Sequence, residues 1–474
     1  MKHISFAFTA VLSAVLAFSC QAPEDDPVTG AEPPHLVSSS PEDGAADLVG
    51  TSLDLILTFD RNVMCPTAER GRIAVSGGAQ IGNIDAYMQE VTLGITGLEQ
   101  GSTYTVTLPA GTVIGYDNNP AEEISITFTM KSFSGDNGQE IAGTLVTDDP
   151  IPAAARLYDY LRSVYGTRTL SGAMAHVNWN TDEAQWIGQC TGKYPAIAFF
   201  DYVHLADSPA DWIDYGDITP VREWWEAGGL VGAGWHWNVP ISQGSTELTF
   251  NVETDDGKAN TFSAADALIE GTWENAVLEA DLEKIADYLM LLQEAGIPVI
   301  WRPLHEAAGN TYTYGTGAWF WWGADGADAY VALWRYMFDW FKAAGLRNLI
   351  WVWTTQTSSF SDIDFAFYPG DDYVDIVGKD IYNDADAASL AGQFSTVASL
   401  SEHKMVTLSE LGNVADMGPQ WDAGAQWLFF MPWYDYGNDY TAGYAHAHAD
   451  IGWWTATFAS DAVIDRSELP DDLF

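Results

Sequence analysis

The sequence predicts an α/β protein: a (β/α)8 barrel that follows a small all-β sandwich. Two patterns and a break between them predict this architecture. From residue 141 to residue 474, buried-type strands alternate with amphipathic, helix-like segments. Residues 33–131 carry short alternating strands separated by turn signals, and residues 132–140 are rich in Gly, Ser and Asp. We therefore expect a sandwich over 33–131, a linker over 132–140 and a barrel over 141–474.

The N-terminal residues predict a signal and an anchor. Lys2 and His3 precede an apolar run of about fifteen residues, which is short for a membrane span. The run ends at "FSC", which resembles a bacterial lipoprotein signal. This resemblance implies a signal peptide over 1–19, lipidation at Cys20 and an acidic tether over 20–32. We expect a lipid-anchored protein of the cell envelope, at the outer membrane and facing either side; ordinary secretion is the alternative.

Composition limits the ligands. The chain has 19 Lys and Arg against 66 Asp and Glu, a formal net charge of −47. This balance excludes nucleic acid and anionic membranes as targets and disfavours acidic polysaccharides. The 21 tryptophans favour a neutral carbohydrate, because indole rings fit the apolar faces of sugars. Cys65 and Cys190 fall in different predicted domains, so we expect no disulfide framework.

The predicted sandwich contains the alternating segments "SLDLILTF", "RIAVSG", "VTLGIT", "TYTVTLP" and "ISITFTM". With the opening "SSSPEDGAADLVG", they resemble the bacterial Ig-like domains found in front of secreted enzymes. No cluster of catalytic groups accompanies them in the sequence. We interpret this domain as a spacer, with carbohydrate binding as the alternative.

Eight buried-type strands are predicted in the barrel. They begin at residues 169, 196, 230, 297, 348, 374, 405 and 451. The intervening segment 275–296 repeats apolar residues at helical spacing and ends at Gly296. An average repeat of about 40 residues suits a barrel with loop insertions.

Polar and aromatic side chains follow the predicted strands. In strand order they are His176; Asp201 and Tyr202; Trp235, His236 and Trp237; Arg302, His305 and Glu306; Trp351 and Trp353; Asp380 and Tyr382; Glu410; Trp453 and Trp454. Chemistry in such barrels takes place at the carboxyl ends of the strands. A full ring of such groups predicts a site at the barrel mouth.

Two carboxylates stand out in this ring. Glu306 ends strand four and Glu410 ends strand seven, so the two can face each other across the mouth. Glycoside hydrolysis uses such a pair, one as the acid and one as the base or nucleophile. For either residue alone, a structural ion pair such as Glu306 with Arg302 is the alternative.

The motifs "WRPLHE", "WFWWG", "DIVGKDIYND" and "LSELG" together resemble glycoside hydrolase family 26 over residues 143–470. This family consists of retaining barrel enzymes, best known as endo-β-1,4-mannanases. The resemblance implies that Glu306 is the acid/base and Glu410 the nucleophile. It implies substrate-binding roles for His236, His305, Trp319 and Tyr382. The strand-end positions add His176, Asp201, Arg302, Trp353 and Trp454.

One departure from the family pattern is the segment "AAGNTYTYGTGA", residues 307–318, where the family has a very short link. It leaves the preference for chain length and branching open. "HAHAD", residues 446–450, could be a metal triad, but a loop beside the cleft is favoured, and retaining hydrolysis needs no metal or other cofactor.

We therefore predict a monomeric, retaining endo-hydrolase of neutral β-1,4-mannan or galactomannan. Three alternatives stay open: a β-glucanase or β-1,3-xylanase of the same family, an exo-enzyme releasing mannobiose, and a non-catalytic surface lipoprotein that binds glycans. Product analysis on a panel of polysaccharides separates them.

Overall fold

A computed structural model describes residues 32–48, 52–98, 101–130, 141–176, 179–309, 317–356, 364–401, 403–437, 440–441 and 443–474. The predicted signal peptide, Cys20, almost all of the tether and the linker lie outside the described residues. So does much of the inserted segment, residues 310–316. Within the described part of the chain, every helix is too short or too polar to cross a bilayer.

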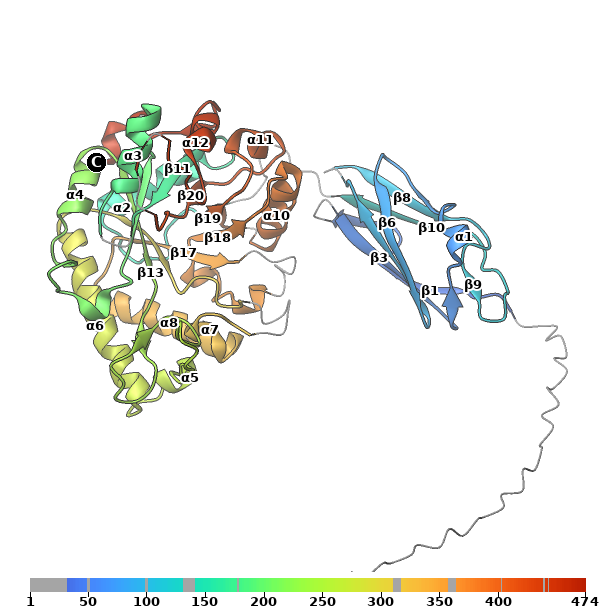
Figure 1. Ribbon diagram of the computed structural model, residues 1–474, viewed down its shortest axis with the longest axis horizontal. Helices are drawn as coiled ribbons and strands as arrows, with labels where there is room; N and C mark the ends of the chain where they lie inside the picture. The colour runs from blue at the N-terminus through green and yellow to red at the C-terminus, as the bar shows by residue number, and fades with distance from the viewer. Residues whose placement is uncertain are drawn as a thin grey trace, which may run out of the picture.

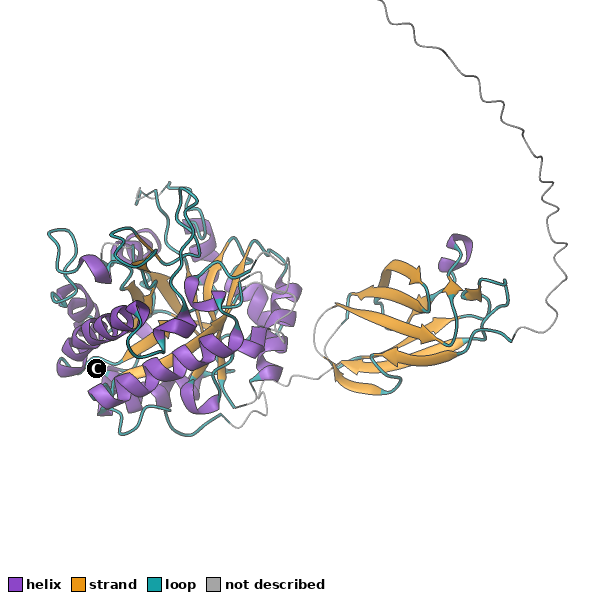
Figure 2. Ribbon diagram, turned by 90° about the horizontal axis from the view of Figure 1, so that it is seen from below, coloured by secondary structure: helices purple, strands orange, loops and turns teal. Residues whose placement is uncertain are grey.

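The N-terminal domain is the predicted sandwich of two four-stranded sheets (Figure 2). One sheet has the order β1 (Leu36–Ser40), β3 (Ser52–Phe59), β7 (Glu90–Thr96), β6 (Gln80–Tyr87). The other has the order β2 (Ala45–Leu48), β10 (Ile124–Met130), β8 (Thr103–Leu108), β5 (Ala74–Val75). A bridge of β4 (Val63–Met64) with β9 (Ile114–Gly115) and the short helix α1 (Thr67–Arg70) complete it. Alternate residues of β8, beginning with Tyr104, face the core, which matches the sequence alternation.

The C-terminal domain is a closed barrel of eight parallel strands, as predicted. Their order is β11 (Thr169–Met174), β12 (Ile197–Asp201), β13 (Leu230–Trp235), β16 (Val299–Pro303), β17 (Leu349–Thr355), β18 (Ile376–Tyr382), β19 (Met405–Gly412) and β20 (Phe429–Pro432). Strand β11 pairs with both β12 and β20, which closes the ring. The short β21 (Val463–Ile464) also pairs with β11, and β14 (Val239–Pro240) forms a hairpin with β15 (Leu248–Thr249).

Helices surround this barrel (Figure 1). They are α2 (Pro152–Val164), α3 (Asp182–Thr191), α4 (Thr219–Glu226), α5 (Ala264–Ala267), α6 (Trp273–Glu294), α7 (Trp321–Ala324), α8 (Ala327–Ala344), α10 (Ala387–Leu400), α11 (Met417–Asp422) and α12 (Ile451–Thr457). Helix α8 shows why they form: Tyr330, Leu333, Trp334 and Met337 share one buried face at helical spacing. It ends at Gly345, whose φ of 87° suits a residue without a side chain.

The eighth strand differs from the prediction. Residues 451–457 form helix α12, because the Asp450 carboxylate caps the first turn by accepting the Trp453 amide N–H at 2.8 Å. The eighth strand is β20, a short apolar run that follows α11. The apolar and aromatic residues of "IGWWTAT" were interpreted as a buried strand, but the capping aspartate favours a helix.

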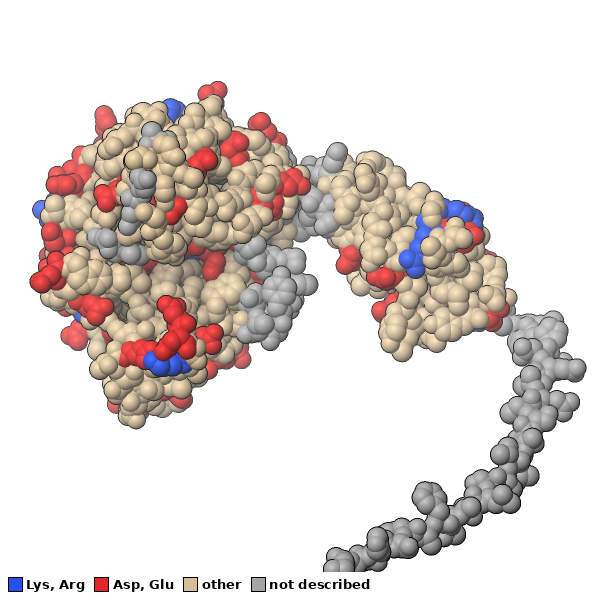
Figure 3. Space-filling model, in the orientation of Figure 1, with Lys and Arg blue, Asp and Glu red and all other residues tan. Residues whose placement is uncertain are grey.

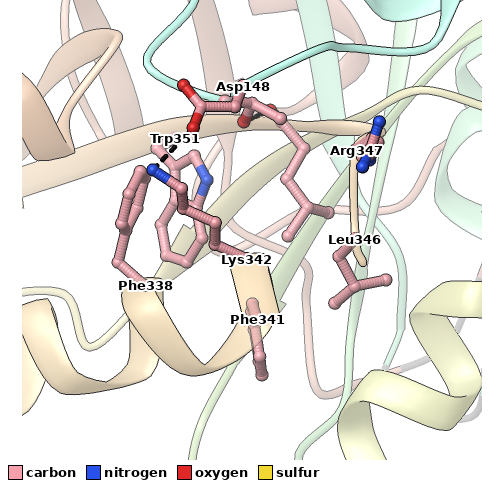
Figure 4. A pocket seen from close by; sticks show the side chains of 9 residues that line it. Asp148, Phe338, Phe341, Lys342, Leu346, Arg347 and Trp351 are labelled. Atoms are coloured by element: carbon pink, nitrogen blue, oxygen red, sulfur yellow. Dashed lines mark hydrogen bonds and ion pairs between the residues drawn. The ribbon is translucent and has the colours of Figure 1, made fainter. Parts of the chain in front are cut away.

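The segment around Val146, which leads into the domain, covers the end of the barrel at which the strands begin. The Asp375 carboxylate accepts the amide N–H groups of Val146 and Trp351, each at 2.8 Å. Beside it lies a cavity of about 190 Å³ between this segment, α8 and β17, where Lys342 pairs with Asp148 at 2.6 Å (Figure 4). Groups at the amino ends of barrel strands serve stability, so this cavity is not the catalytic site.

Candidate active site

The candidate site is a cleft of about 440 Å³ at the carboxyl ends of the barrel strands. Its lining combines acidic and imidazole groups with a majority of apolar and aromatic side chains, as in sugar-binding clefts. The lining residues are Asp201, Val203, His236, Phe250, His305, Glu306, Phe320, Tyr382, Glu410, Trp433, Tyr434, Tyr436 and His448. The surrounding surface of the barrel domain carries many acidic and few basic side chains (Figure 3). This charge distribution favours a neutral ligand.

Glu306 lies in the turn that follows β16, with a half-buried side chain. The Trp319 indole N–H donates a hydrogen bond to its Oε2 at 3.0 Å. Trp319 therefore stands beside the carboxyl group that the sequence assigned as the acid/base. The turn contains two non-glycine residues with left-handed backbone, Leu304 at φ 47° and Glu306 at φ 52°. Such backbone is strained and is most often found at functional sites.

Glu410 lies in β19 and is 7% exposed. The Tyr382 hydroxyl donates to its Oε1, and the Arg302 Nη2 lies 3.1 Å from its Oε2. Burial and the Glu410 charge raise the pKa of Tyr382, so this hydroxyl stays protonated and remains a donor. Both contacts fix the position of the Glu410 carboxylate.

Asp380, at the end of β18, is a third carboxylate, which the sequence placed in the strand-end ring without a catalytic or substrate-binding role. One oxygen from each of Glu306, Asp380 and Glu410 lies within 4.8 Å of the other two. Asp380 is fully buried, pairs with Arg302 and accepts the Ser409 hydroxyl at 2.7 Å. Its place at a strand end was visible in the sequence, but a bulge in the β18–β19 register brings it opposite Glu410.

The Arg302 guanidinium contacts two of these three carboxylates, Asp380 and Glu410. Burial raises the pKa of Glu306 well above its usual range, and the charges of Asp380 and Glu410 add to the rise against the opposing effect of Arg302. Burial also raises the pKa of Asp380 to about 7, although Arg302 opposes the rise. Three carboxylates this close cannot all ionise, so Glu306 is the group that holds a proton near neutral pH.

A pair of histidines lies on the strand-three side of the cleft. The Asp201 carboxylate accepts the His236 amide N–H at 3.1 Å and contacts its Nδ1 at 2.5 Å. A proton on Nδ1 of His236 satisfies this contact with the Asp201 carboxylate. The His305 ring lies 4.4 Å from that of His236, edge to face. Burial, followed by the Arg302 charge, lowers the pKa of His305 well below its usual range, so its ring is neutral.

The loop after β20 forms the opposite wall with Trp433, Tyr434 and Tyr436. These aromatics directly follow β20, the eighth strand, which explains why they reach the mouth of the barrel. His176, which follows β11, lies next to this wall, with its ring 5.2 Å from that of Tyr434. His176 therefore supports the cleft and is not itself part of its lining.

Two predicted substrate-binding residues lie elsewhere. Trp353 is 1% exposed and packs against Phe365 and Tyr368 at 5.1 Å each. Successive side chains of a strand face opposite sides, and its neighbour Thr354 takes the inward position beside Arg302. Trp454 is 1% exposed on α12, against Phe458. Neither indole can reach a sugar in the cleft.

The three polar residues of "HAHAD" have separate roles. The His446 Nε2 lies 3.3 Å from the Glu183 carboxylate, and its ring stacks on Trp186. Asp450 caps α12, and His448 alone lines the cleft. The favoured interpretation, a loop beside the cleft, agrees with this arrangement. The two cysteines, Cys65 and Cys190, are free thiols, as expected.

Hydrogen bonds from three neighbouring elements hold the strained turn. Tyr330 donates to the Leu304 carbonyl and the Trp322 indole to the His305 carbonyl, each at 2.8 Å. The Glu306 amide donates to the Thr354 carbonyl at 3.2 Å. At the end of the turn, the Gln356 amide donates to the Gly309 carbonyl at 2.7 Å.

Gly309 also touches the far side of the insertion. A Cβ added at Gly309 would lie 2.7 Å from the Ala318 Cα, so the backbone at Gly309 is in direct contact with the backbone at Ala318. With these four hydrogen bonds, the contact fixes the backbone that carries Glu306.

Removing the Tyr330 hydroxyl is expected to impair positioning of Glu306. A Tyr330→Phe variant leaves the Leu304 carbonyl buried without its donor, so kcat should fall about tenfold with little change in KM. The matched control is Tyr336→Phe on the same helix, whose hydroxyl bonds Glu279 away from the turn. Steady-state kinetics and thermal unfolding of both variants separate positioning from stability. Equal kcat values for the two variants would contradict the positioning role.

The spacing of the catalytic groups decides between two mechanisms. Retaining glycosidases keep their two carboxyl groups about 5–5.5 Å apart, whereas inverting ones need about 6.5–9.5 Å to admit water. One oxygen of Glu306 lies within 4.8 Å of one oxygen of Glu410, which is closer than the separation that an inverting enzyme needs for its attacking water. The geometry fits a double displacement with Glu306 as acid and Glu410 as nucleophile.

Sequence comparisons agree with this geometry. The profile described as Glycosyl hydrolase family 26 matches residues 146–455, and that of the Bacterial Ig-like domain matches residues 30–130. Mannan endo-1,4-beta-mannosidase A from Piromyces sp. is 32% identical over 63% of this chain and 46% of its own. The mannan endo-1,4-beta-mannosidase of Thermothelomyces thermophilus is 35% identical over 55% and 50%. The chain thus spans about half the length of the curated relatives that it matches.

Solved structures that resemble this chain agree with the sequence comparisons. The GH26 domain of an endo-beta-mannanase/endo-beta-glucanase from Prevotella bryantii is 41% identical, with a TM-score of 0.63 over 70% of this chain and all of its own. A beta-mannanase from a symbiotic protist of the termite Reticulitermes speratus, complexed with gluco-manno-oligosaccharide, is 33% identical with a TM-score of 0.60. It covers 70% of this chain and 99% of its own.

Proposed function

The chain belongs to glycosyl hydrolase family 26, and on that premise we propose that it is a retaining endo-β-1,4-mannanase. Its substrate is a neutral β-mannan or galactomannan, cut within the chain. The observation that carries this proposal is the approach of Glu306 and Glu410 within 4.8 Å at the ends of strands four and seven. Several relatives that the chain matches are mannan endo-1,4-beta-mannosidases, which supports mannan as the substrate.

In the first step, Glu306 gives its proton to the departing glycosidic oxygen, while Glu410 attacks the anomeric carbon and forms a glycosyl ester. Arg302 and Tyr382 hold the attacking carboxylate, and Trp319 orients the acid. In the second step, the ionised Glu306 takes a proton from water, which attacks the same carbon and releases Glu410. The two inversions retain the β-configuration.

A panel of linear mannan, galactomannan, lichenan and β-1,3-xylan tests the substrate. We expect reducing ends from the two mannans at least tenfold faster than from the others, with mixed oligosaccharides as early products. Nuclear magnetic resonance of the first product should show the β-anomer. Mannobiose as the only early product would mean exo action, and preference for lichenan would mean a β-glucanase. Binding without any cleavage would support the glycan-binding alternative.

We also propose that the enzyme is a monomer anchored at the outer membrane through lipid on Cys20. The motif at residues 18–20 and the polar residues that follow support it. The sandwich then serves as a spacer between anchor and barrel. Metabolic labelling with palmitate in a bacterial host, compared with a Cys20→Ala variant, tests the anchor; equal labelling of both chains would reject it.

A further inference from the structure

Trp212 differs in exposure from the other tryptophans that the structure describes. Its side chain is 52% exposed, whereas the other tryptophans of the described residues are buried or half-buried. It lies in the loop between β12 and α4, at the same end of the barrel as the catalytic groups. The flat face of an exposed indole suits stacking on the apolar face of a sugar ring.

The turn that carries Trp212 is firmly held. Ala210 and Ile213 exchange both backbone hydrogen bonds, at 2.7 and 3.1 Å, which closes a tight turn around Trp212. Ile213 is 2% exposed and anchors the turn in the core. The Tyr215 hydroxyl accepts the His204 amide N–H and donates to the Asp201 carbonyl, each at 3.0 Å. The indole is thus presented on a fixed support, which limits the entropy lost when a ligand binds.

His204 links Trp212 to the lining of the cleft. Asp201 and Val203 line the cleft, and His204 is the next residue along the chain. The His204 ring meets the Trp212 ring edge to face, with 4.4 Å between their centroids. One residue, His204, therefore separates the cleft lining along the chain from the exposed indole that it contacts. Asp211, beside Trp212, is exposed and can accept hydrogen bonds from hydroxyl groups.

We infer that Trp212, with His204, forms an outlying sugar-binding subsite, beyond the cleft that holds the reacting bond. The indole face stacks on the apolar face of a hexose unit of a longer β-linked chain, while Asp211 accepts its hydroxyl groups. This inference rests on the proposed function and deepens it. The subsite makes the enzyme more efficient on long chains than on short ones.

Kinetics on a ladder of β-1,4-mannooligosaccharides from triose to hexaose test this subsite. For Trp212→Ala we expect kcat/KM on the hexaose to fall about tenfold and that on the triose to fall less than twofold. Trp212→Phe should restore part of the loss. The matched control is Tyr87→Ala, which removes an aromatic ring that is 72% exposed on the sandwich and should leave the ladder unchanged.

The outcomes are distinguishable. A wild-type enzyme that cuts none of these oligosaccharides would overturn the proposed function itself. A wild-type enzyme that cuts them, together with a Trp212→Ala variant whose losses are equal at every length, would overturn the subsite alone. Equal losses for Trp212→Ala and Tyr87→Ala would do the same.

Discussion

Replacing Glu410 with alanine is expected to lower kcat on mannan by about 10⁴-fold or more, because no other group can form the glycosyl ester. Arg302 and Tyr382, which contact Glu410, remain around the vacated volume. A small anion can enter this volume and attack the anomeric carbon. With sodium azide and an aryl β-mannobioside whose leaving group is good, the variant should release an α-glycosyl azide.

The matched control is Glu306→Ala with the same substrate and anion. In that variant Glu410 still forms the ester, and azide replaces water in the second step, so the product should be the β-azide. Circular dichroism and thermal unfolding establish that both variants are folded. A β-azide from Glu410→Ala, or an α-azide from Glu306→Ala, would reverse the two assignments.

Replacing Glu306 with glutamine is expected to lower kcat/KM on mannan by about 10²–10⁴-fold, since the glycosidic oxygen then departs without a proton. An aryl mannobioside with a dinitrophenolate leaving group needs no such proton, so its first step should remain close to wild type. Hydrolysis of the glycosyl ester is then slow, because no general base activates the water. A burst of dinitrophenolate followed by slow turnover is the expected signature, measured by stopped-flow absorbance.

The pH profile gives a second test of the same residue. Glu306 acts as an acid only while protonated, and its pKa is raised by burial and by Asp380 and Glu410. Wild-type kcat/KM should therefore hold through mildly acidic pH and fall as the pH rises through this pKa. With the dinitrophenyl substrate, Glu306→Gln should lose this basic limb. Persistence of the limb would assign it to another group.

The fold followed from the sequence wherever a strand is rich in apolar residues and bounded by turns. Strands one to seven of the barrel are of this kind, and their order along the chain sets the order in the sheet. The eighth was wrong because the apolar and aromatic residues of "IGWWTAT" were interpreted as a buried strand, whereas Asp450 caps this segment as a helix. The capping residue immediately before the segment was the signal for the helix.

The site followed from the sequence to the level of strand ends. Glu306 and Glu410 were found because each ends a strand. Trp353 was placed in the cleft incorrectly because a shift of one residue along a strand reverses the side it faces. The contact of Asp201 with His236, 35 positions apart, and the bulge that turns Asp380 toward Glu410 depend on register, which the sequence does not show.

The backbone contact between Gly309 and Ala318 has a consequence for divergence within the family. Gly309 and Ala318 are held in contact, so the number of residues that connect them is not set by the distance between them. Doubling the length of a connecting loop costs only about 0.6 kcal/mol. Homologues can therefore differ in the length and sequence of this connection while the groups that transfer the proton keep their positions.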